Sequence, residues 1–226
     1  MSITPNVLMT GGTGFVGTWM QKTRRPHVNI WAMGKEDYET YSLDRIKGIH
    51  FVVHLAPIDP ALAIECAHNN NARLLYCSSG IVYHAENDTQ YRRDKMRWEA
   101  DCLASGLDVV IARLFSFWGS CKMQKAFFNA ARNGEPLEIW GDVTRSLMTG
   151  ADMGRRMWDI LRYGEMGQAY DVGSTRPVTA LQLARRIKAL CNTTSEIVDV
   201  SEIVKEHFEN PIPMPHYVPE NVVELP

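Results

Sequence analysis

The most informative stretch of this chain is Thr10-Gly11-Gly12-Thr13-Gly14-Phe15-Val16-Gly17. It follows the apolar run Val7–Met9, which predicts a buried strand, and the residues after it can continue as a helix. A strand, a tight glycine turn and a helix N-terminus together form an anion-binding site, because backbone N–H groups and the helix dipole point at one spot. Gly12 or Gly14 would let a pyrophosphate approach the backbone, and Gly17 would let the helix lie close to the sheet. The stretch therefore predicts a dinucleotide-binding turn rather than an ordinary glycine turn.

Length and composition limit the class of protein. The 226 residues suffice for one large domain, or for one domain with a small appendage. A net charge of −2 gives no electrostatic reason to expect nucleic acid or a membrane surface as a partner. No apolar run approaches the ~20 residues of a membrane span, and the start Met1–Pro5 lacks the features of a signal peptide. We therefore expect a cytoplasmic protein.

The cysteines agree with that compartment. The chain has five of them, an odd number, scattered and without a Cys-x-x-Cys pair: Cys66, Cys77, Cys102, Cys121 and Cys191. This pattern favours free thiols in a reducing compartment, with no disulfide framework and no structural metal site.

Apolar runs alternate with helical stretches through the first half of the chain. Besides the run before the glycine turn, we expect strands at 28–33, 51–56, 73–78 and 108–114, and helices at 60–69 and 88–105. Strands that are apolar on both faces and alternate with helices form a parallel sheet covered on each side. The expected fold class is therefore α/β, a Rossmann-like doubly wound parallel sheet, with ligands beyond the carboxyl ends of the strands.

The pattern changes after Gly119. Helices are expected at 122–133, 151–163 and 179–191, with a turn and a short strand within 135–142 and an extended proline-rich tail at 210–226. We therefore expect a dinucleotide-binding domain over residues 1–119 and a small substrate-binding region over residues 120–226, partly interleaved with it.

A candidate catalytic group follows the strand at 73–78. Tyr91 and Lys95 are four residues apart, so on a helix they share a face. The ammonium of Lys95 would stabilise the phenolate of Tyr91 and lower its pKa from about 10 toward the range of a general base. The hydroxyl of Ser79, at the strand end, can hold the substrate oxygen whose proton moves. Such a group suits oxidation of an alcohol by hydride transfer to a nicotinamide, although a Tyr-x-x-x-Lys spacing also arises by chance.

Taken in order, these motifs resemble those of the extended short-chain dehydrogenase/reductases, specifically the NAD-dependent epimerase/dehydratase family that acts on nucleotide sugars. The similar segments run nearly end to end: Thr10–Gly17 to T-G-G-x-G-F-x-G, Val53–Ala56 to V-x-H-L-A, Ser78–Tyr83 to S-S-x-x-V-Y, Tyr91 with Lys95 to Y-x-x-x-K, Arg113–Gly119 to R-x-F-N-x-x-G, and Tyr170–Gly173 to Y-N-V-G. Each later motif is loose alone, but their order is specific.

The resemblance implies a nicotinamide cofactor. Its implied contacts at the turn and the third strand are Gly11, Gly12, Thr13, Gly14, Phe15, Val16, Gly17, Leu55 and Ala56. Lys95 would also bond the nicotinamide ribose beside Tyr91. NAD is the expected cofactor and NADP is the alternative. Met33 or Gly34 stands at the position of the family's ribose-binding acid, and Lys35, Glu36 and Asp37 follow it. An Asp there would mark NAD, whereas Lys35 could accept a 2′-phosphate. No metal is expected.

The resemblance also implies a substrate site for a nucleotide sugar. Ser79 would orient the substrate and Tyr83 would line the sugar pocket. Ser116 stands where the family has Asn. Arg145 would bind the diphosphate or nucleotide, since its planar fork suits phosphate; a solvated surface arginine is the alternative. A homodimer is a family expectation only.

The chain departs from the family pattern by being shorter. Only one strand, at 28–33, stands where the family has two. It is either the second strand, or it replaces the third, in which case part of the adenosine pocket is missing. Ser79 and Tyr91 are only twelve residues apart, so the loop that normally covers the substrate is trimmed.

The expected function is an NAD(P)-dependent nucleotide-sugar epimerase or ketoreductase. Dehydratases of the family usually place an acidic pair just after the catalytic hydroxyl residue, where this chain has Gly80 and Ile81. That difference favours epimerase or ketoreductase chemistry. The alternative, suggested by the trimmed segments, is a catalytically degenerate protein that binds nucleotides or nucleotide sugars on the same fold.

Overall fold

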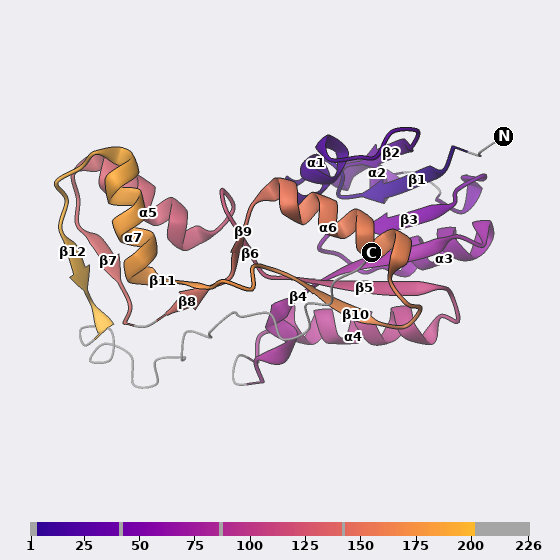
Figure 1. The fold of residues 1–226 in the computed structure, drawn as a ribbon. Helices are drawn as coiled ribbons and strands as arrows, with labels where there is room; N and C mark the ends of the chain where they lie inside the picture. The colour runs from indigo at the N-terminus through magenta and orange to yellow at the C-terminus, as the bar shows by residue number, and fades with distance from the viewer. Residues whose placement is uncertain (1–3, 41–42, 86–87, 142, 202–226) are drawn as a thin grey trace.

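A six-stranded parallel sheet forms the centre of the molecule, with the strand order β10-β5-β4-β3-β1-β2 (Figure 1). The computed structural model describes residues 4–40, 43–85, 88–141 and 143–201. Its central strands are β1 (Asn6–Thr10), β2 (Asn29–Met33), β3 (Phe51–His54), β4 (Arg73–Ser79), β5 (Val109–Leu114) and β10 (Ala169–Val172). The doubly wound parallel sheet expected from the sequence is confirmed.

Helices cover both faces of this sheet. On one face lie α1 (Phe15–Lys22) and α6 (Gly150–Tyr163), and on the other lie α3 (Ala61–Asn70) and α4 (Gln90–Ala104) (Figure 1). Successive side chains of a strand point to opposite faces. Within β1, Val7 and Met9 therefore join the core under α1 and α6, whereas Leu8 joins the core under α3 and α4. Both faces are apolar, which explains the continuous apolar runs.

The strand β2 takes the second-strand position. It pairs with β1 along its whole length, from Asn6 opposite Asn29 to Thr10 opposite Met33. The alternative that this strand replaces the family's third strand is therefore wrong. The connection to β3 contains two short helices that the sequence did not predict, α2 (Lys35–Thr40) and η1 (Leu43–Arg45).

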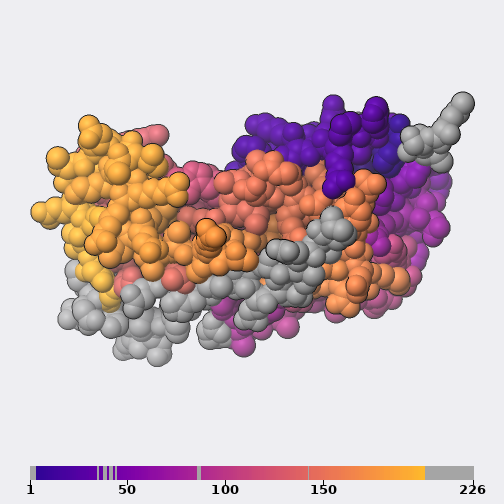
Figure 2. All heavy atoms as spheres, viewed as in Figure 1, coloured from indigo at the N-terminus to yellow at the C-terminus, as the bar shows by residue number. Residues whose placement is uncertain are grey.

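A smaller unit lies at one end of the molecule, where Figure 2 shows it as a separate lobe. It contains α5 (Lys122–Asn133), α7 (Ala180–Cys191) and three pairs of short strands: β7 (Leu137–Ile139) with β12 (Ile197–Asp199), β8 (Thr144–Arg145) with β11 (Val178–Thr179), and β6 (Ser116–Phe117) with β9 (Leu147–Met148). Phe127, Leu137, Leu183 and Ile187 belong to its own apolar core. Most of these short strands are too brief for the sequence to reveal.

The region after residue 119 contributes to both units. Helix α6 and strand β10 return to the central sheet, whereas α5 and α7 pack on each other in the lobe. The division at 119/120 stays a prediction, and the tail expected at 210–226 lies outside the described residues.

Several simpler features concern the described part of the chain. All five cysteines are free thiols there. No helix within it combines the length and apolarity needed to cross a membrane. The same residues hold no group of three or more His, Cys, Asp or Glu side chains arranged for a metal ion.

Candidate active site

The glycine turn packs directly against the end of β3. Gly11 has φ +69°, and a Cβ on it would lie 2.7 Å from the backbone nitrogen of Ala56 and 2.9 Å from the carbonyl carbon of Leu55. The Leu55 N–H donates to the Thr10 carbonyl over 3.1 Å. The structure therefore brings Leu55 and Ala56 beside the turn, and only glycine fits at position 11.

Helix α1 begins at the turn and lies almost in contact with it. A Cβ on Gly17 would lie 2.5 Å from the Cα of Gly12, and the Gln21 side chain donates to the Gly12 carbonyl over 2.8 Å. Gly14 precedes the helix and has no side chain to cap it, so the first helical N–H groups are available for an anion. The ring of Phe15 stacks on that of Phe117. Phe15 can therefore contribute its backbone, rather than its ring, to the turn.

The end of β2 brings a carboxylate close to the same turn. The Asp37 carboxylate accepts a hydrogen bond from the Gly34 N–H over 2.9 Å. A Cβ on Gly34 would lie 3.4 Å from the Thr13 hydroxyl and 3.6 Å from that carboxylate, so Thr13 and Asp37 converge on Gly34. Lys35 begins α2, but its side chain lies outside the described part of the chain.

Helix α4 carries the expected tyrosine and lysine. Thr89 caps its first turn by accepting from the Arg92 N–H over 3.2 Å. Tyr91 is 46% exposed and Lys95 only 3% exposed, and the Lys95 ammonium lies 5.8 Å from the centre of the Tyr91 ring. The two side chains are therefore neighbours, one at the surface and one in the interior.

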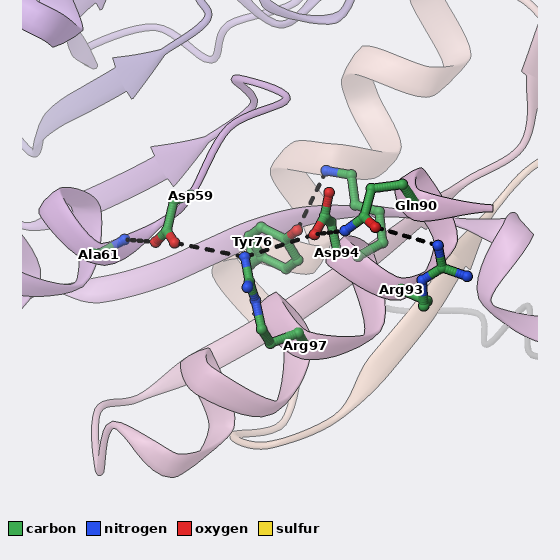
Figure 3. A network of polar contacts seen from close by, with 8 residues as sticks. Asp59, Ala61, Tyr76, Gln90, Arg93, Asp94 and Arg97 are labelled. Atoms are coloured by element: carbon green, nitrogen blue, oxygen red, sulfur yellow. Dashed lines mark hydrogen bonds and ion pairs between the residues drawn. The ribbon is translucent and has the colours of Figure 1, made fainter. Parts of the chain in front are cut away.

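The Lys95 ammonium makes its hydrogen bonds to β4. It donates to the Cys77 carbonyl over 2.9 Å and to the Tyr76 hydroxyl over 3.3 Å. Burial lowers the pKa of Lys95 below its usual value. The Tyr76 side chain extends from β4 toward helix α4, where the Lys95 ammonium meets its hydroxyl (Figure 3). Sequence reasoning missed Tyr76, because a tyrosine within an apolar run looks like an ordinary core residue.

An exposed polar network runs along α4 and reaches the residues before α3 (Figure 3). Gln90 donates to Asp94 over 2.8 Å, and Arg97 lies 3.7 Å from the Asp94 carboxylate and 3.9 Å from that of Asp59. Asp59 in turn accepts from the Ala61 N–H at the start of α3. Exposed ion pairs of this kind stabilise little individually, but they tie α4 to α3.

Ser79 lies at the carboxyl end of β4, as expected. Its hydroxyl accepts from the Ile81 N–H over 3.3 Å and caps the short helix η2 (Gly80–Tyr83). A Cβ on Gly80 would lie 2.8 Å from the ring of Phe115, so the turn after Ser79 packs tightly on the chain that leaves β5.

The Tyr83 hydroxyl belongs to a network of charged groups. It accepts from Arg113 over 2.8 Å and donates to Asp171 over 2.9 Å. Arg113 also pairs with both carboxylate oxygens of Glu99, at 2.7 and 3.1 Å. Burial raises the pKa of Tyr83. The phenol therefore bonds within the protein and joins η2, β5, β10 and α4, while a role in lining the sugar pocket stays a prediction.

Ser116 and Arg145 line one hollow of about 450 Å³. Lys122 and Trp140 also border it. Arg145 is only 8% exposed and donates to the Thr144 carbonyl over 2.8 Å, so the alternative of a solvated surface arginine is wrong. Because Ser116 follows β5 by two residues, the hollow begins beside the end of the sheet.

His54 is a buried packing residue of β3. Its Nε2 donates to the Ile58 carbonyl over 3.1 Å, so its Nδ1 accepts from the Thr10 hydroxyl over 2.9 Å. Burial lowers the pKa of His54 to about 4, which keeps the ring neutral near neutral pH.

Comparison with known proteins identifies solved structures that share this fold. No protein-family model matches the chain, and no curated protein does. Among solved structures, the UDP-N-acetylglucosamine 4-epimerase of Methanobrevibacter ruminantium in complex with UDP-N-acetylmuramic acid is 19% identical, with a TM-score of 0.72 over 88% of this chain and 86% of that one.

Two further structures give the same result. The enzyme WbmF of Bordetella bronchiseptica, in complex with NAD⁺, is 18% identical with a TM-score of 0.67, over 86% of this chain and 80% of that one. The dTDP-glucose 4,6-dehydratase of Bacillus anthracis, in complex with NAD, is 17% identical with a TM-score of 0.68, over 96% and 92% of the two chains. The chain thus has the fold of these enzymes.

Proposed function

We propose that this chain is an NAD-dependent enzyme of the extended short-chain dehydrogenase/reductase type, an epimerase or ketoreductase acting on a nucleotide sugar. One observation carries the proposal. The glycine turn after β1, Ser79 after β4 and the Tyr91–Lys95 pair of α4 meet the sheet at its carboxyl edge, where ligands of open α/β sheets bind.

The turn fits a dinucleotide. Its glycines leave backbone N–H groups and the start of α1 open to a pyrophosphate, and a side chain at position 11 or 17 would collide with backbone. The structural neighbours support this, since several were solved with NAD bound. A nicotinamide bound there would supply the hydride acceptor.

We assign the preference for NAD over NADP to Asp37. Its carboxylate lies at the end of β2 beside Thr13, where it can accept hydrogen bonds from ribose hydroxyls. The same negative charge would repel a 2′-phosphate. Asp37 thus decides between the two cofactors that the sequence left open.

The proton step would use the exposed phenol of Tyr91. The substrate hydroxyl gives its proton to Tyr91 while its carbon loses a hydride, so the alcohol is oxidised to a ketone. Lys95 favours the phenolate form through its positive charge, and Ser79 holds the substrate oxygen. An epimerase then returns the hydride to the other face of the sugar, and a ketoreductase runs the step in reverse.

The substrate would extend into the hollow that begins beside β5. Arg145 brings a buried guanidinium to its wall, suited to a diphosphate, and Trp140 offers a ring for a nucleobase. The neighbour from Methanobrevibacter ruminantium and the WbmF complex with UDP support a uridine nucleotide. A homodimer stays a prediction.

The turn after Ser79 supports the assignment to epimerase or ketoreductase chemistry. A dehydratase-like acid at position 80 would bring its Cβ to 2.8 Å from the Phe115 ring, so that ring or the turn would have to shift. Replacement of that glycine would push η2 away from β5.

The test starts with the purified protein. Denaturation releases any bound nucleotide for mass spectrometry, and calorimetry measures binding of added NAD and NADP. UDP-sugars are then screened with the native chain, with Tyr91→Phe and with a control, Tyr163→Phe, whose hydroxyl accepts from Arg25 away from the site.

We expect tighter binding of NAD than of NADP, and turnover that falls ~10³-fold in Tyr91→Phe, since general acid–base groups contribute ~10²–10⁴-fold. The control variant should retain its activity. Failure to bind either dinucleotide would overturn the enzyme assignment. Binding of dinucleotide and UDP-sugar without turnover would instead favour the degenerate binding protein.

A further inference from the structure

Tyr76 places a buried hydroxyl under the proposed catalytic pair. The residue is fully buried in β4. Its ring stacks on His54 with the centroids 6.0 Å apart, and the Lys95 ammonium lies 5.1 Å from the Tyr76 centroid and 3.3 Å from its hydroxyl. The ring packs as a phenylalanine would. A buried hydroxyl lowers stability unless it is hydrogen-bonded. Packing of the apolar core therefore gives no reason for a tyrosine rather than a phenylalanine at position 76.

The groups around Lys95 are almost all neutral near neutral pH. Burial raises the pKa of the Tyr76 phenol, raises that of Cys77 to about 11 and that of Cys102 to about 12, and lowers that of His54 to about 4. The nearby carboxylate of Glu99 forms its ion pair with Arg113.

Neutral groups therefore hold the lysine. Within the described residues, no carboxylate forms an ion pair with Lys95. Its ammonium bonds the Tyr76 hydroxyl and the Cys77 carbonyl, and it lies 5.5 Å from the Trp98 ring as well as 5.8 Å from that of Tyr91.

We propose that Tyr76 is a positioning residue, whose hydroxyl accepts a hydrogen bond from Lys95 and thereby holds the ammonium beside Tyr91. A lysine side chain has four flexible methylenes and three donors, so two fixed acceptors on β4 restrict where its charge can lie. The inference rests on the proposed function in one respect, that Tyr91 is the group that exchanges the proton. The placement of the charge itself needs neither cofactor nor substrate.

The first experiment measures that placement directly. Ultraviolet titration follows phenolate formation in the intact chain, and subtraction of the Tyr91→Phe titration isolates Tyr91. Tyr76→Phe should raise the titration midpoint of Tyr91 by about one pH unit, since an opposite charge within 4–6 Å moves such midpoints by roughly 1–3 units. The matched control is Tyr170→Phe. Tyr170 is 4% exposed and its hydroxyl accepts from the Glu165 N–H over 2.8 Å, so this variant also loses one buried hydrogen bond.

A second variant separates positioning from packing. In a Lys95→Met background, Tyr76→Phe should no longer move the Tyr91 midpoint, because there is no ammonium left to hold. Thermal unfolding compares Tyr76→Phe with Tyr170→Phe. If Tyr76→Phe does not fold, Tyr76→Met is the replacement variant, and it should move the midpoint in the same direction.

Activity gives an independent readout. With a UDP-sugar that the native chain turns over, Tyr76→Phe should lower kcat about tenfold at neutral pH and move the acidic limb of the kcat profile upward by about one unit. An unchanged or lowered Tyr91 midpoint in Tyr76→Phe overturns the positioning role. A raised midpoint in a chain that neither binds NAD nor turns over any sugar supports the positioning role and overturns the proposed function.

Discussion

The glycine turn at Thr10–Gly17 and the helix α4 both reach the carboxyl edge of the sheet, but they are built in different ways. The turn works through missing side chains: it lies so close to β3 and α1 that a Cβ at Gly11 or Gly17 would collide with backbone. Helix α4 instead depends on side chains that bond to neighbouring strands. Lys95 bonds two groups of β4, and Glu99 pairs with Arg113 of β5.

This difference predicts different responses to substitution. Backbone atoms cannot move aside for an added side chain. A substitution in the turn should therefore lower the stability and the affinity for the cofactor together. Contacts of α4 involve hydroxyls and charges, so their loss should separate stability from chemistry.

The largest effect is expected at the contact between the turn and α1. Gly17→Ala puts a Cβ 2.5 Å from the Gly12 Cα and should lower the free energy of unfolding by about 3 kcal/mol, even though alanine favours a helix by about 1 kcal/mol. Chemical denaturation measures it. Gly34→Ala is the control, because its Cβ would meet atoms no nearer than 3.4 Å. Equal stability of the two variants would contradict the close packing.

A somewhat smaller loss is expected when α4 is released from β5. Glu99→Gln removes the negative charge that pairs with the Arg113 guanidinium and should cost about 2.5 kcal/mol, below the 3–5 kcal/mol of a fully buried pair, since the Arg113 side chain is 22% exposed. Thermal and urea unfolding measure the change. Glu65→Gln, on the exposed face of α3, is the control. A loss no greater than that of the control would show that the ion pair does not hold the helix.

The third prediction concerns acid. The pKa of His54 is about 4 in the folded chain, against ~6.5 unfolded. The unfolded chain therefore binds the extra proton first, and stability falls as the pH drops from 6.5 toward 4. Between pH 7 and pH 5 the loss from this group should be about 2 kcal/mol. His54→Gln should flatten that part of the profile, whereas His68→Gln, at an exposed position, should not. Identical profiles would exclude His54 as the cause.

The sequence predicted more of the structure of the glycine turn than of the contacts of α4. Glycines with a set spacing after an apolar run leave a direct signal, so the turn was predicted, with Gly12 or Gly14 facing a pyrophosphate and Gly17 letting α1 lie close to the sheet. The five strands of the first half also followed from apolar runs, but their order in the sheet was not predicted. The position of β2 could not be decided, because pairing with β1 depends on a register that no local pattern specifies.

The residues that hold the site in place could not be predicted from local sequence patterns. Tyr76, Arg113 and Asp171 act through contacts between segments far apart in the chain, 19 residues separating Tyr76 from Lys95 and 88 separating Tyr83 from Asp171. The ion pair between Glu99 and Arg113 likewise leaves no local signal in the sequence. Asp37 was named only as one of several charges after β2, because the turn that folds its carboxylate onto Gly34 is a tertiary feature.

The smallest effect is expected in the hollow lined by Ser116 and Arg145. Like α4 it presents a buried charged side chain, and like the glycine turn it holds that side chain through a backbone group. Arg145 is buried like Lys95, yet its neighbour Thr144 accepts through a backbone carbonyl. Arg145→Lys keeps the charge but loses the planar fork, so the Kd for UDP should rise about tenfold, or ~1.4 kcal/mol, with NAD binding unchanged. Calorimetry with UDP measures it, and Arg176→Lys, at an exposed position, is the control. If UDP binding is unchanged in Arg145→Lys, the guanidinium does not contact the nucleotide, and the hollow beside β5 is not where the substrate's diphosphate lies.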